Sequence, residues 1–560
     1  MKTSHAPQPQ AVMSRNQKIF LCLLLTAHIF TLVLGMFYRY VDGDEGGTLV
    51  VSREVINGRI PVLDINAHNQ PLLYYFYGAW MEMFSGNSIA GARALNVLSM
   101  FLTGALLLWW VYRFTANYWV TIILYFLYIT NLTYFKTNIP VKPFALSNLL
   151  TFSSFAVITS YYFSGGKRLP VVFLSGLLLG ASMGVRLMFT LPFAFVAWII
   201  IVGLRERESL KEIATKTLLF CGGVALPLVP SVLIFLKEPL RAYAVWAGAY
   251  AQIYLGKGSN PDFAVDIYRG LKGGFMINGA ISVLKVPDLS LLLLLAIVSI
   301  FVYFFRTRHG RDSRRADVYL LLWLIFVAVI WVSSSLFIDY LSYINQAVIF
   351  LILLCFPVAE LAAKGVSPRK FAICSLTVLV LLGGLFYAYF QKRHRTSIFY
   401  ALRSSDSVIT PAFVNSVSED VIKKVTRSGD VIFDQWGVFV FASGRRPLNG
   451  YEYPTDMTHY WYFMTEPWRA WKYLYIPEPE VLSRLKMKEI PLVILNEDPR
   501  TKLSELDERT GASRHTAMLK GVVEENYTLY ERHFVKPGNT WMAIYVPKNN
   551  ARQPFKPVPF

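Results

Sequence analysis

The sequence has few charged residues for its length. Of its 560 residues, 16% are Asp, Glu, Lys or Arg, while 54% are hydrophobic and 15% are aromatic. An average soluble domain carries roughly a quarter charged residues, and a mean hydropathy of +0.41 is too high for a water-soluble fold of this length. The composition therefore excludes a purely soluble enzyme and a disordered chain. It predicts an α-helical protein that crosses a membrane many times.

Cysteine is also scarce. The four cysteines all lie inside apolar runs (Cys22, Cys221, Cys355 and Cys374). None is placed to form a disulfide in an aqueous domain, and no zinc-binding spacing is present. The sequence has no heptad pattern, low-complexity segment or evident internal repeat. The first apolar run is not followed by a small-residue cleavage site, so we expect it to stay as a membrane anchor.

What the sequence has in abundance is long apolar runs. A spanning helix needs about 20 mostly apolar residues. By this measure the chain contains about eleven spans, near residues 18–39, 88–111, 118–134, 143–163, 169–185, 187–204, 215–236, 288–305, 317–337, 341–362 and 371–390. The run from Leu169 to Leu204 is too long for one helix and contains Arg186. We therefore predict two helices joined by a turn at Gly184–Arg186.

The basic residues set the orientation. If the N-terminus is cytoplasmic, every cytoplasmic loop carries Lys or Arg, as the positive-inside pattern requires; these residues are Arg113, Lys167, Arg168, several within 205–216 and 306–315, and Lys364, Arg369 and Lys370. This distribution explains much of the net charge of +19 without a nucleic-acid partner. The chain is predicted to be a multi-pass protein of the cell membrane.

Two large regions follow from this orientation. Residues 1–390 form the predicted transmembrane module, whose first outward loop is 40–87. Residues 391–560 are long enough to bury their own core, and they form a predicted extracytoplasmic α/β domain. Its predicted strands are Val431–Asp434, Val438–Ala442, Leu492–Leu495 and Met542–Val546, with a helix over Pro479–Lys488.

The first outward loop opens with three carboxylates, Asp42, Asp44 and Glu45, directly after a spanning helix. Such a cluster can bind a metal, supply a general base or simply be solvated. The two glycines after Glu45 permit a tight turn. We expect a short amphipathic helix over Thr48–Asn57, lying along the membrane surface and ended by Gly58.

The motifs of this loop follow one another in an order that is found in a known protein family. Asp44-Glu45 is followed by Glu54-Val-Ile-Asn-Gly-Arg-Ile-Pro61, then by Pro71-Leu72, then by Ala92-Arg-Ala-Leu-Asn96. This order resembles the first outward loop of the GT-C membrane glycosyltransferases, namely the protein O-mannosyltransferase and lipid A aminoarabinose transferase families. The sequence departs from the family at Asn69, where a basic residue is usual, and at Val141-Lys142-Pro143-Phe144, where a second carboxylate is usual.

The resemblance implies an enzyme that uses a polyprenyl-phosphate sugar as donor. It would be a hexosyl- or pentosyltransferase without a cofactor, acting at the extracytoplasmic face on a lipid, glycan or protein hydroxyl. Cleavage of a sugar–phosphate bond needs a base for the acceptor proton and cations for the leaving phosphate. We predict Asp44 as the base, with Glu45 and Asp42 as neighbours. Direct displacement by the acceptor would invert the anomeric centre.

Cations at head-group depth on the outer face are candidates for the donor phosphate. They are Arg186, Lys142 and Arg93, each of which could instead be a structural ion-pair partner. Candidate substrate contacts are His68, Asn69, Tyr74, Asp339 and Tyr340. No metal is required for a monophosphate donor, because Arg and Lys can neutralise it. The spacing of Asp42 and Asp44 nevertheless keeps a divalent ion as an alternative.

Two other classes of protein have the same gross composition. A membrane transporter of a lipid or solute would show repeats and charges near the bilayer centre, whereas here the charges crowd the outer face. A non-catalytic scaffold would use the tail to bind a partner. The ordered motifs favour the glycosyltransferase, and release of polyprenyl phosphate from a donor would separate the three hypotheses.

Overall fold

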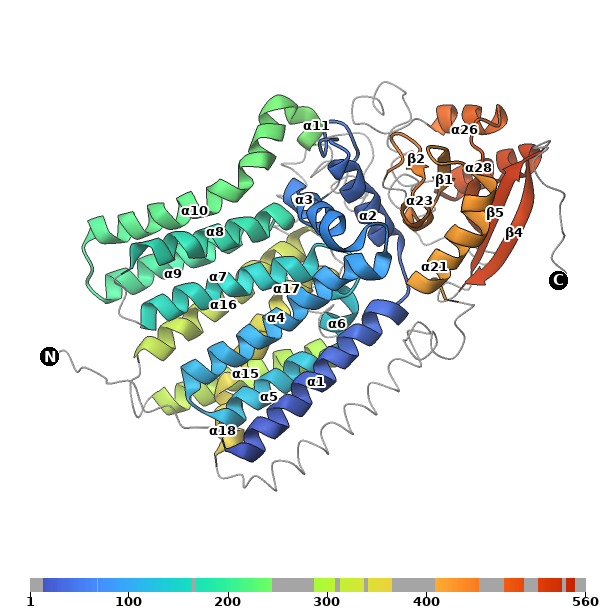
Figure 1. Cartoon of the computed structure of the whole chain (residues 1–560). Coiled ribbons are helices and arrows are strands. Elements are labelled where there is room, and N and C mark those ends of the chain that lie inside the picture. Colours follow the sequence, from blue (N-terminus) through green and yellow to red (C-terminus); the bar gives the residue numbers. More distant parts are fainter. Residues whose placement is uncertain are drawn as a thin grey trace.

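The computed structural model is a bundle of membrane helices joined to a C-terminal α/β domain (Figure 1). The structure describes residues 14–67, 69–163, 168–243, 287–307, 313–336, 341–364, 408–452, 478–497, 512–535 and 540–548. The predicted span 371–390, His68, Asp339 and Tyr340 lie outside these residues.

The bundle contains long apolar helices and a few short connecting ones. They are α1 (Arg15–Tyr38), α4 (Ile89–Thr115), α5 (Tyr118–Ile129), α6 (Leu132–Asn138), α7 (Phe144–Phe163), α8 (Leu169–Val185), α9 (Leu191–Arg205), α10 (Leu210–Lys237), α11 (Pro239–Tyr243), α15 (Pro287–Thr307), α16 (Ser313–Leu336), α17 (Leu341–Leu354) and α18 (Phe356–Ala363). Each predicted span within the described residues overlaps one or two of these helices. Their facing sides form one continuous hydrophobic core.

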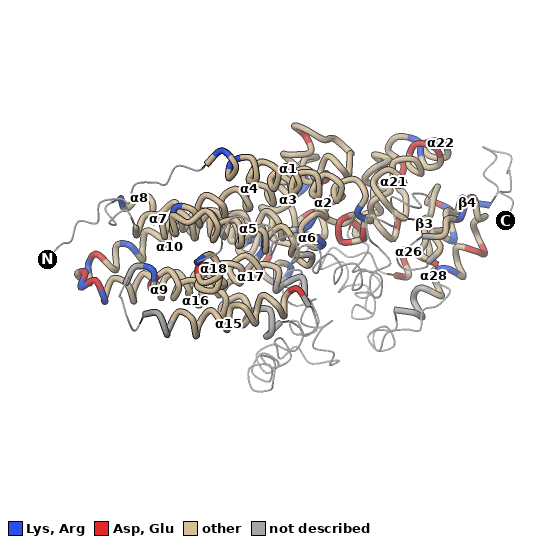
Figure 2. The backbone as a smooth tube through the Cα atoms, turned by 90° about the horizontal axis from the view of Figure 1, so that it is seen from below, with Lys and Arg blue, Asp and Glu red and all other residues tan. Residues whose placement is uncertain are grey.

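By length and apolar composition alone, four described helices can cross a membrane: α1, α4, α7 and α10. The bent pair Asn345–Leu354 and Phe356–Ala363 raises this number to five if the pair is one span. The predicted number of about eleven spans is therefore not reached by this criterion, because several apolar helices, such as α8 and α9, are shorter than 18 residues. Figure 2 shows few charged positions along the middle of the helices, with charges gathered at the helix ends.

The predicted break in the long apolar run is confirmed. Helix α8 ends at Val185, Arg186 is its C-cap residue, and α9 begins at Leu191.

Helix α8 lies against α10 at very short range. A Cβ atom added at Gly176 would stand 2.1 Å from the carbonyl oxygen of Phe220, so only glycine permits this approach.

The segment predicted as the first outward loop folds into two helices, α2 (Gly43–Ile56) and α3 (Pro71–Trp80), and a π-helical turn (Met81–Ser85) follows α3. Helix α2 begins earlier than predicted, since both glycines after Glu45 are helical. The apolar side chains of α2 that were expected to face the membrane surface are instead packed inside the protein. Leu49 and Val50 are buried in a hydrophobic cluster between the bundle and the C-terminal domain. Gly58 follows the helix with φ +87°, as its predicted role at the helix end requires.

The C-terminal domain is built on a five-stranded sheet. Its described elements are α21 (Pro411–Val417), a π-helical turn (Ser418–Ile422), α22 (Lys423–Val425), β1 (Val431–Asp434), α23 (Val438–Ser443), β2 (Arg446–Pro447), α26 (Glu478–Lys486), β3 (Val493–Glu497), α28 (Ala512–Asn526), β4 (Tyr527–Val535) and β5 (Thr540–Pro547). The strand order is β2-β1-β3-β5-β4. Strand β1 pairs in parallel with β2 and β3, and β5 pairs antiparallel with β3 and β4.

One predicted strand of this domain is a helix. Val438–Ala442 lies within α23, which packs against α2 rather than in the sheet. The other three predicted strands are confirmed as β1, β3 and β5, and neither β2 nor β4 was predicted. Helix α2 lies between the bundle and the C-terminal domain (Figure 1), so the loop with the carboxylate cluster is held from both sides.

Candidate active site

The carboxylate cluster lies at the N-terminus of α2. Asp42 is the N-cap residue, and its side chain accepts a hydrogen bond of 3.0 Å from the backbone N–H of Glu45. Asp44 and Glu45 belong to the first turn. Carboxylates are favoured here because the first backbone N–H groups of a helix are unpaired and its dipole is positive at this end. The three acidic residues are close in the sequence, but the helix points their side chains in different directions and so into different surroundings.

Glu45 points inward and is completely buried. Its two carboxylate oxygens each accept a hydrogen bond of 2.7 Å from the guanidinium of Arg93, on α4. Oε1 also accepts a bond of 2.9 Å from the backbone N–H of Val141. Both side chains of this ion pair have an exposed fraction of 0%. Glu45 is therefore occupied by internal partners and is not presented to a substrate.

Arg93 uses all five of its N–H donors inside the protein. Besides the two bonds to Glu45, it donates to the backbone carbonyls of Met36, Arg39 and Tyr40, at 3.0, 2.8 and 3.0 Å. These carbonyls lie at the end of α1 and just beyond it, where a helix leaves its carbonyls without internal partners. Arg93 has no donor left for a phosphate. Its predicted role as a phosphate ligand does not fit this geometry.

Asp44 and Asp42 instead face a shared lysine. The ammonium of Lys142 lies 2.8 Å from Oδ2 of Asp44 and 3.1 Å from Oδ2 of Asp42. The Asp44 side chain remains 41% exposed, against 20% for Asp42. Burial opposes the ionisation of Asp42, but the charges of Lys142 and Arg39 outweigh it and lower the pKa of Asp42. Burial likewise opposes the charge on Lys142, yet the two aspartates raise its pKa above the usual value.

The backbone around Lys142 is held by three buried side chains. Glu45 accepts from Val141 N–H, the hydroxyl of Tyr77 donates to the Lys142 carbonyl at 3.1 Å, and the amide of Asn96 donates to the Pro140 carbonyl. The single hydroxyl proton of Tyr77 is shared between the Lys142 carbonyl and the side-chain oxygen of Asn96. Sequence reasoning missed Tyr77 and did not assign Asn96 a role, although Asn96 ends the last matched motif.

Arg186 lies at the same end of α7 as Lys142, beside its first residue. Its side chain is buried, at 6% exposure, and the guanidinium carbon stands 4.3 Å from the ring centroid of Phe144, the first residue of α7. Two residues earlier, Gly184 contacts Leu72 near the start of α3. The structure thus brings Arg186 close to the segment that contains two predicted substrate residues.

Those two residues are Asn69 and Tyr74. The Tyr74 side chain is buried, and its hydroxyl accepts a hydrogen bond of 3.0 Å from the Asn69 backbone N–H. This bond closes the turn that leads into α3. Both residues lie near the C-terminal end of α8, where Gly184 faces Leu72. Their role as substrate contacts stays a prediction.

The carboxylate pair does not suit a divalent metal in this arrangement. Lys142 occupies the position between Asp42 and Asp44 where a cation bound by both would have to lie. Among the described residues, no group of three or more His, Cys, Asp or Glu side chains is placed to hold a metal. A hard cation prefers several oxygen ligands. Here the two aspartates form ion pairs with the ammonium of Lys142 instead.

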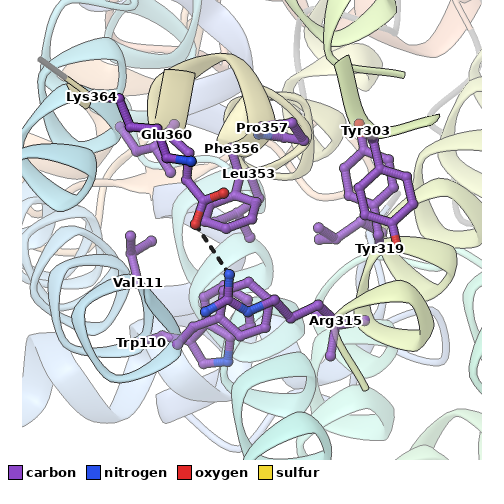
Figure 3. A pocket seen from close by; sticks show the side chains of 14 residues that line it. Trp110, Val111, Tyr303, Arg315, Tyr319, Leu353, Phe356, Pro357, Glu360 and Lys364 are labelled. Atoms are coloured by element: carbon purple, nitrogen blue, oxygen red, sulfur yellow. Dashed lines mark hydrogen bonds and ion pairs between the residues drawn. The ribbon is translucent and has the colours of Figure 1, made fainter. Parts of the chain in front are cut away.

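A cavity of about 210 Å³ lies at the opposite end of the bundle (Figure 3). Trp110, near the far end of α4, is among its lining residues, and it is separated from Arg93 by about 25 Å of helix. At the rim, Arg315 and Glu360 form an ion pair of 3.2 Å. Because of this separation, the cavity is not part of the carboxylate site.

We compared the sequence and the structure with those of known proteins. No protein-family model and no curated protein matches the sequence. The structure is similar to that of ArnT from Cupriavidus metallidurans bound to undecaprenyl phosphate, with a TM-score of 0.59 and 12% sequence identity over 96% of this chain and 99% of that one. The same protein in the apo state gives a TM-score of 0.56 and 13% identity over 95% and 98% of the two chains.

ArnT is a lipid A aminoarabinose transferase of the GT-C class. The resemblance to that group, predicted from the order of motifs in the first outward loop, is therefore confirmed as a likeness of fold. It covers nearly the whole of both chains, including the bundle and the C-terminal domain.

Proposed function

We propose that this protein is a membrane glycosyltransferase that moves a sugar from a polyprenyl-phosphate donor to an acceptor hydroxyl. The acceptor oxygen forms a bond to the anomeric carbon as the bond from that carbon to the phosphate oxygen breaks. Polyprenyl phosphate leaves with the bonding electron pair, and Asp44 takes the acceptor proton. A single displacement of this kind inverts the anomeric centre. The fold shared with ArnT supports the donor class.

The different exposures and partners of the three acidic side chains support Asp44 as the base. It is the most exposed of them, whereas Glu45 is buried against Arg93 and Asp42 caps α2. A general base must reach the proton that it removes. Of the three carboxylates, that of Asp44 is the one exposed enough to reach the acceptor proton.

Lys142 and Arg186 are the proposed phosphate ligands. Lys142 is held beside Asp44 by an anchored backbone, and Arg186 lies close to it across Phe144. Negative charge grows on the phosphate as the sugar leaves, and fixed cations stabilise that charge most where water is excluded. We assign Arg93 and Glu45 a positioning role, and the proposed reaction includes no metal.

The reaction is tested directly with purified protein in detergent. A set of polyprenyl-phosphate sugars is supplied together with candidate acceptors, and release of free polyprenyl phosphate is followed. The proposal expects release that depends on both the sugar donor and the acceptor. If no donor in the set is consumed, while vesicles containing the protein move a lipid or solute across the membrane, the transporter hypothesis replaces it.

The same arrangement supports the predicted topology. Asp44 and Lys142 lie beside the start of α4, whereas Arg113 is in its last turn, at the opposite end of the helix. Basic loops are usually cytoplasmic, which supports our proposal that the site and the C-terminal domain face outward. Alkaline phosphatase fused after Phe560 is expected to be active, and fused after Arg113 inactive. The reverse pattern would place the site in the cytoplasm.

Replacing Arg186 tests the phosphate assignment. Arginine can grip two phosphate oxygens with its planar guanidinium, whereas lysine offers a single charge. We expect Arg186→Lys to weaken donor affinity and Arg186→Ala to weaken it further, by a factor on the order of ten or more. Donor affinity is measured on folded protein in detergent, with Arg168→Ala, at the other end of α8, as the control. Equal donor affinity in wild type and Arg186→Ala would remove Arg186 from the phosphate site and leave Lys142.

A further inference from the structure

The contact between α2 and the C-terminal domain is unusually close at one residue. A Cβ atom built on Gly46 would stand 1.9 Å from the carbonyl oxygen of Trp436 and 2.8 Å from the backbone nitrogen of Val438. These are backbone atoms, so they cannot move aside as a flexible side chain would. Gly46 lies two residues after Asp44. The backbone of the C-terminal domain therefore rests directly on the helical turn that carries the proposed base.

The segment that makes this contact is itself held in a defined shape. Gly437 has φ +72°, a conformation that residues with a Cβ rarely adopt. The buried carboxylate of Asp434 accepts hydrogen bonds from the backbone N–H groups of Trp436, Phe439 and Val440, at 2.9, 2.9 and 3.1 Å. Burial raises the pKa of Asp434 to about 6, although these N–H groups favour the charged form. The shape of the turn before α23 is thus fixed by hydrogen bonds within the C-terminal domain itself.

The other end of α23 is held by α2. Arg53, in the last turn of α2, donates to the carbonyls of Val440, Phe441 and Arg445 at 3.2, 3.3 and 2.7 Å. The last carbonyls of a helix have no internal partners, and a guanidinium can satisfy several of them at once. Helix α2 thus contacts both ends of α23, through Gly46 at its own start and Arg53 at its own end.

A second set of bonds ties the flanking chain to the same domain. The backbone N–H of Val41 donates to the carbonyl of Ile409 at 2.6 Å, just before α2 begins. Arg59, just after α2 ends, lies 3.1 Å from the buried carboxylate of Glu452. Helix α2 is therefore fastened to the C-terminal domain before it, along it and after it.

From these contacts we infer that the C-terminal domain positions the catalytic base. In this assignment, which rests on the proposed function, Gly46 and Arg53 are positioning residues, and α23 with its preceding turn is the surface that fixes the height and rotation of α2. Of the two proposed phosphate ligands, Lys142 contacts Asp44, whereas Arg186 lies elsewhere, against the first residue of α7. A displaced α2 would therefore move Asp44 relative to a donor that Arg186 still holds. A misplacement of about 1 Å can cost roughly 10²-fold in rate.

The test compares two glycine-to-alanine variants. Gly46→Ala inserts a methyl group against the Trp436 carbonyl, whereas Gly521→Ala, in α28, meets nothing within 4 Å. We expect Gly46→Ala to lower kcat by roughly 10²-fold while the donor KM stays close to that of wild type. Gly521→Ala is expected to match wild type in both constants.

A second pair of variants keeps the test informative if Gly46→Ala does not fold. Arg53→Ala removes the bonds to α23 without adding bulk, and Arg53→Lys keeps a cation that can satisfy part of them. We expect kcat to fall in Arg53→Ala and to recover partly in Arg53→Lys, again with little change in donor KM. A loss of thermal stability with unchanged kcat on folded protein would mean that the interface is structural only, which overturns the inference. An inactive wild-type protein would instead overturn the proposed function.

Discussion

Replacing Asp44 with asparagine is expected to abolish glycosyl transfer while folding and donor binding persist. The substitution keeps the size of the side chain but removes the basic oxygen, so the loss should appear in turnover. A general base typically contributes about 10²–10⁴-fold. Asp44 is half-exposed, and Lys142 would keep Asp42 as a partner, 3.1 Å away. Loss of one partly exposed ion pair costs about 1 kcal/mol or less in stability.

The matched control for this experiment is Asp42→Asn. Asparagine caps a helix about as well as aspartate, so α2 should keep its start at Gly43. We expect a much smaller loss of turnover than in Asp44→Asn. Turnover is measured as release of polyprenyl phosphate at saturating donor, and donor affinity is measured separately. Full activity in Asp44→Asn together with loss of activity in Asp42→Asn would transfer the role of base to Asp42.

The second large effect is expected from the buried ion pair of Glu45 and Arg93. Replacing Arg93 with methionine keeps most of the bulk but leaves the Glu45 carboxylate buried without its partner. Removing one member of a buried pair typically costs roughly 3–5 kcal/mol. The carbonyls at the end of α1 lose their donors as well. We therefore expect a marked fall in the unfolding temperature of the protein in detergent.

Arg93→Lys distinguishes this structural role from the phosphate role that the sequence suggested. Lysine keeps the charge but has three donors in place of five, and it cannot reach Glu45 and the α1 carbonyls together. Thermal stability should therefore still fall clearly. If Arg93→Lys instead unfolds at the wild-type temperature and binds donor more weakly, Arg93 contacts phosphate and the buried geometry is not the functional one.

Local features of the sequence predicted where the apolar helices lie, whereas the predicted number of about eleven spans is not confirmed. An apolar helix is set mainly by the length and apolarity of one continuous segment, so most of these helices could be placed without knowing their neighbours. The break at Arg186 followed from the same reasoning, because one helix of that length would hold an arginine near its middle. Gly58 after α2 could likewise be predicted from its own conformational freedom.

The start of α2 and the state of Val438–Ala442 could not be predicted in this way. Gly46 and Gly47 disfavour a helix by roughly 1 kcal/mol each, which suggested a turn. The structure keeps them helical because Asp42 caps the helix and the Trp436 backbone requires a residue without a Cβ at Gly46. The apolar β-branched run of α23 is typical of a strand, but it packs on α2 and has Arg53 at its end.

The candidate site shows the same limit most clearly. The sequence alone determined that carboxylates gather directly after the first apolar helix and that candidate cations lie at helix ends. It predicted Asp44 as the base but could not show how the surroundings of Asp44 and Glu45 differ, since the two are adjacent in the chain but about 100° apart around a helix. The tertiary structure decided that difference. Arg93, 48 residues away on α4, holds Glu45 in the interior, and the anchored Lys142 meets Asp44 at the surface.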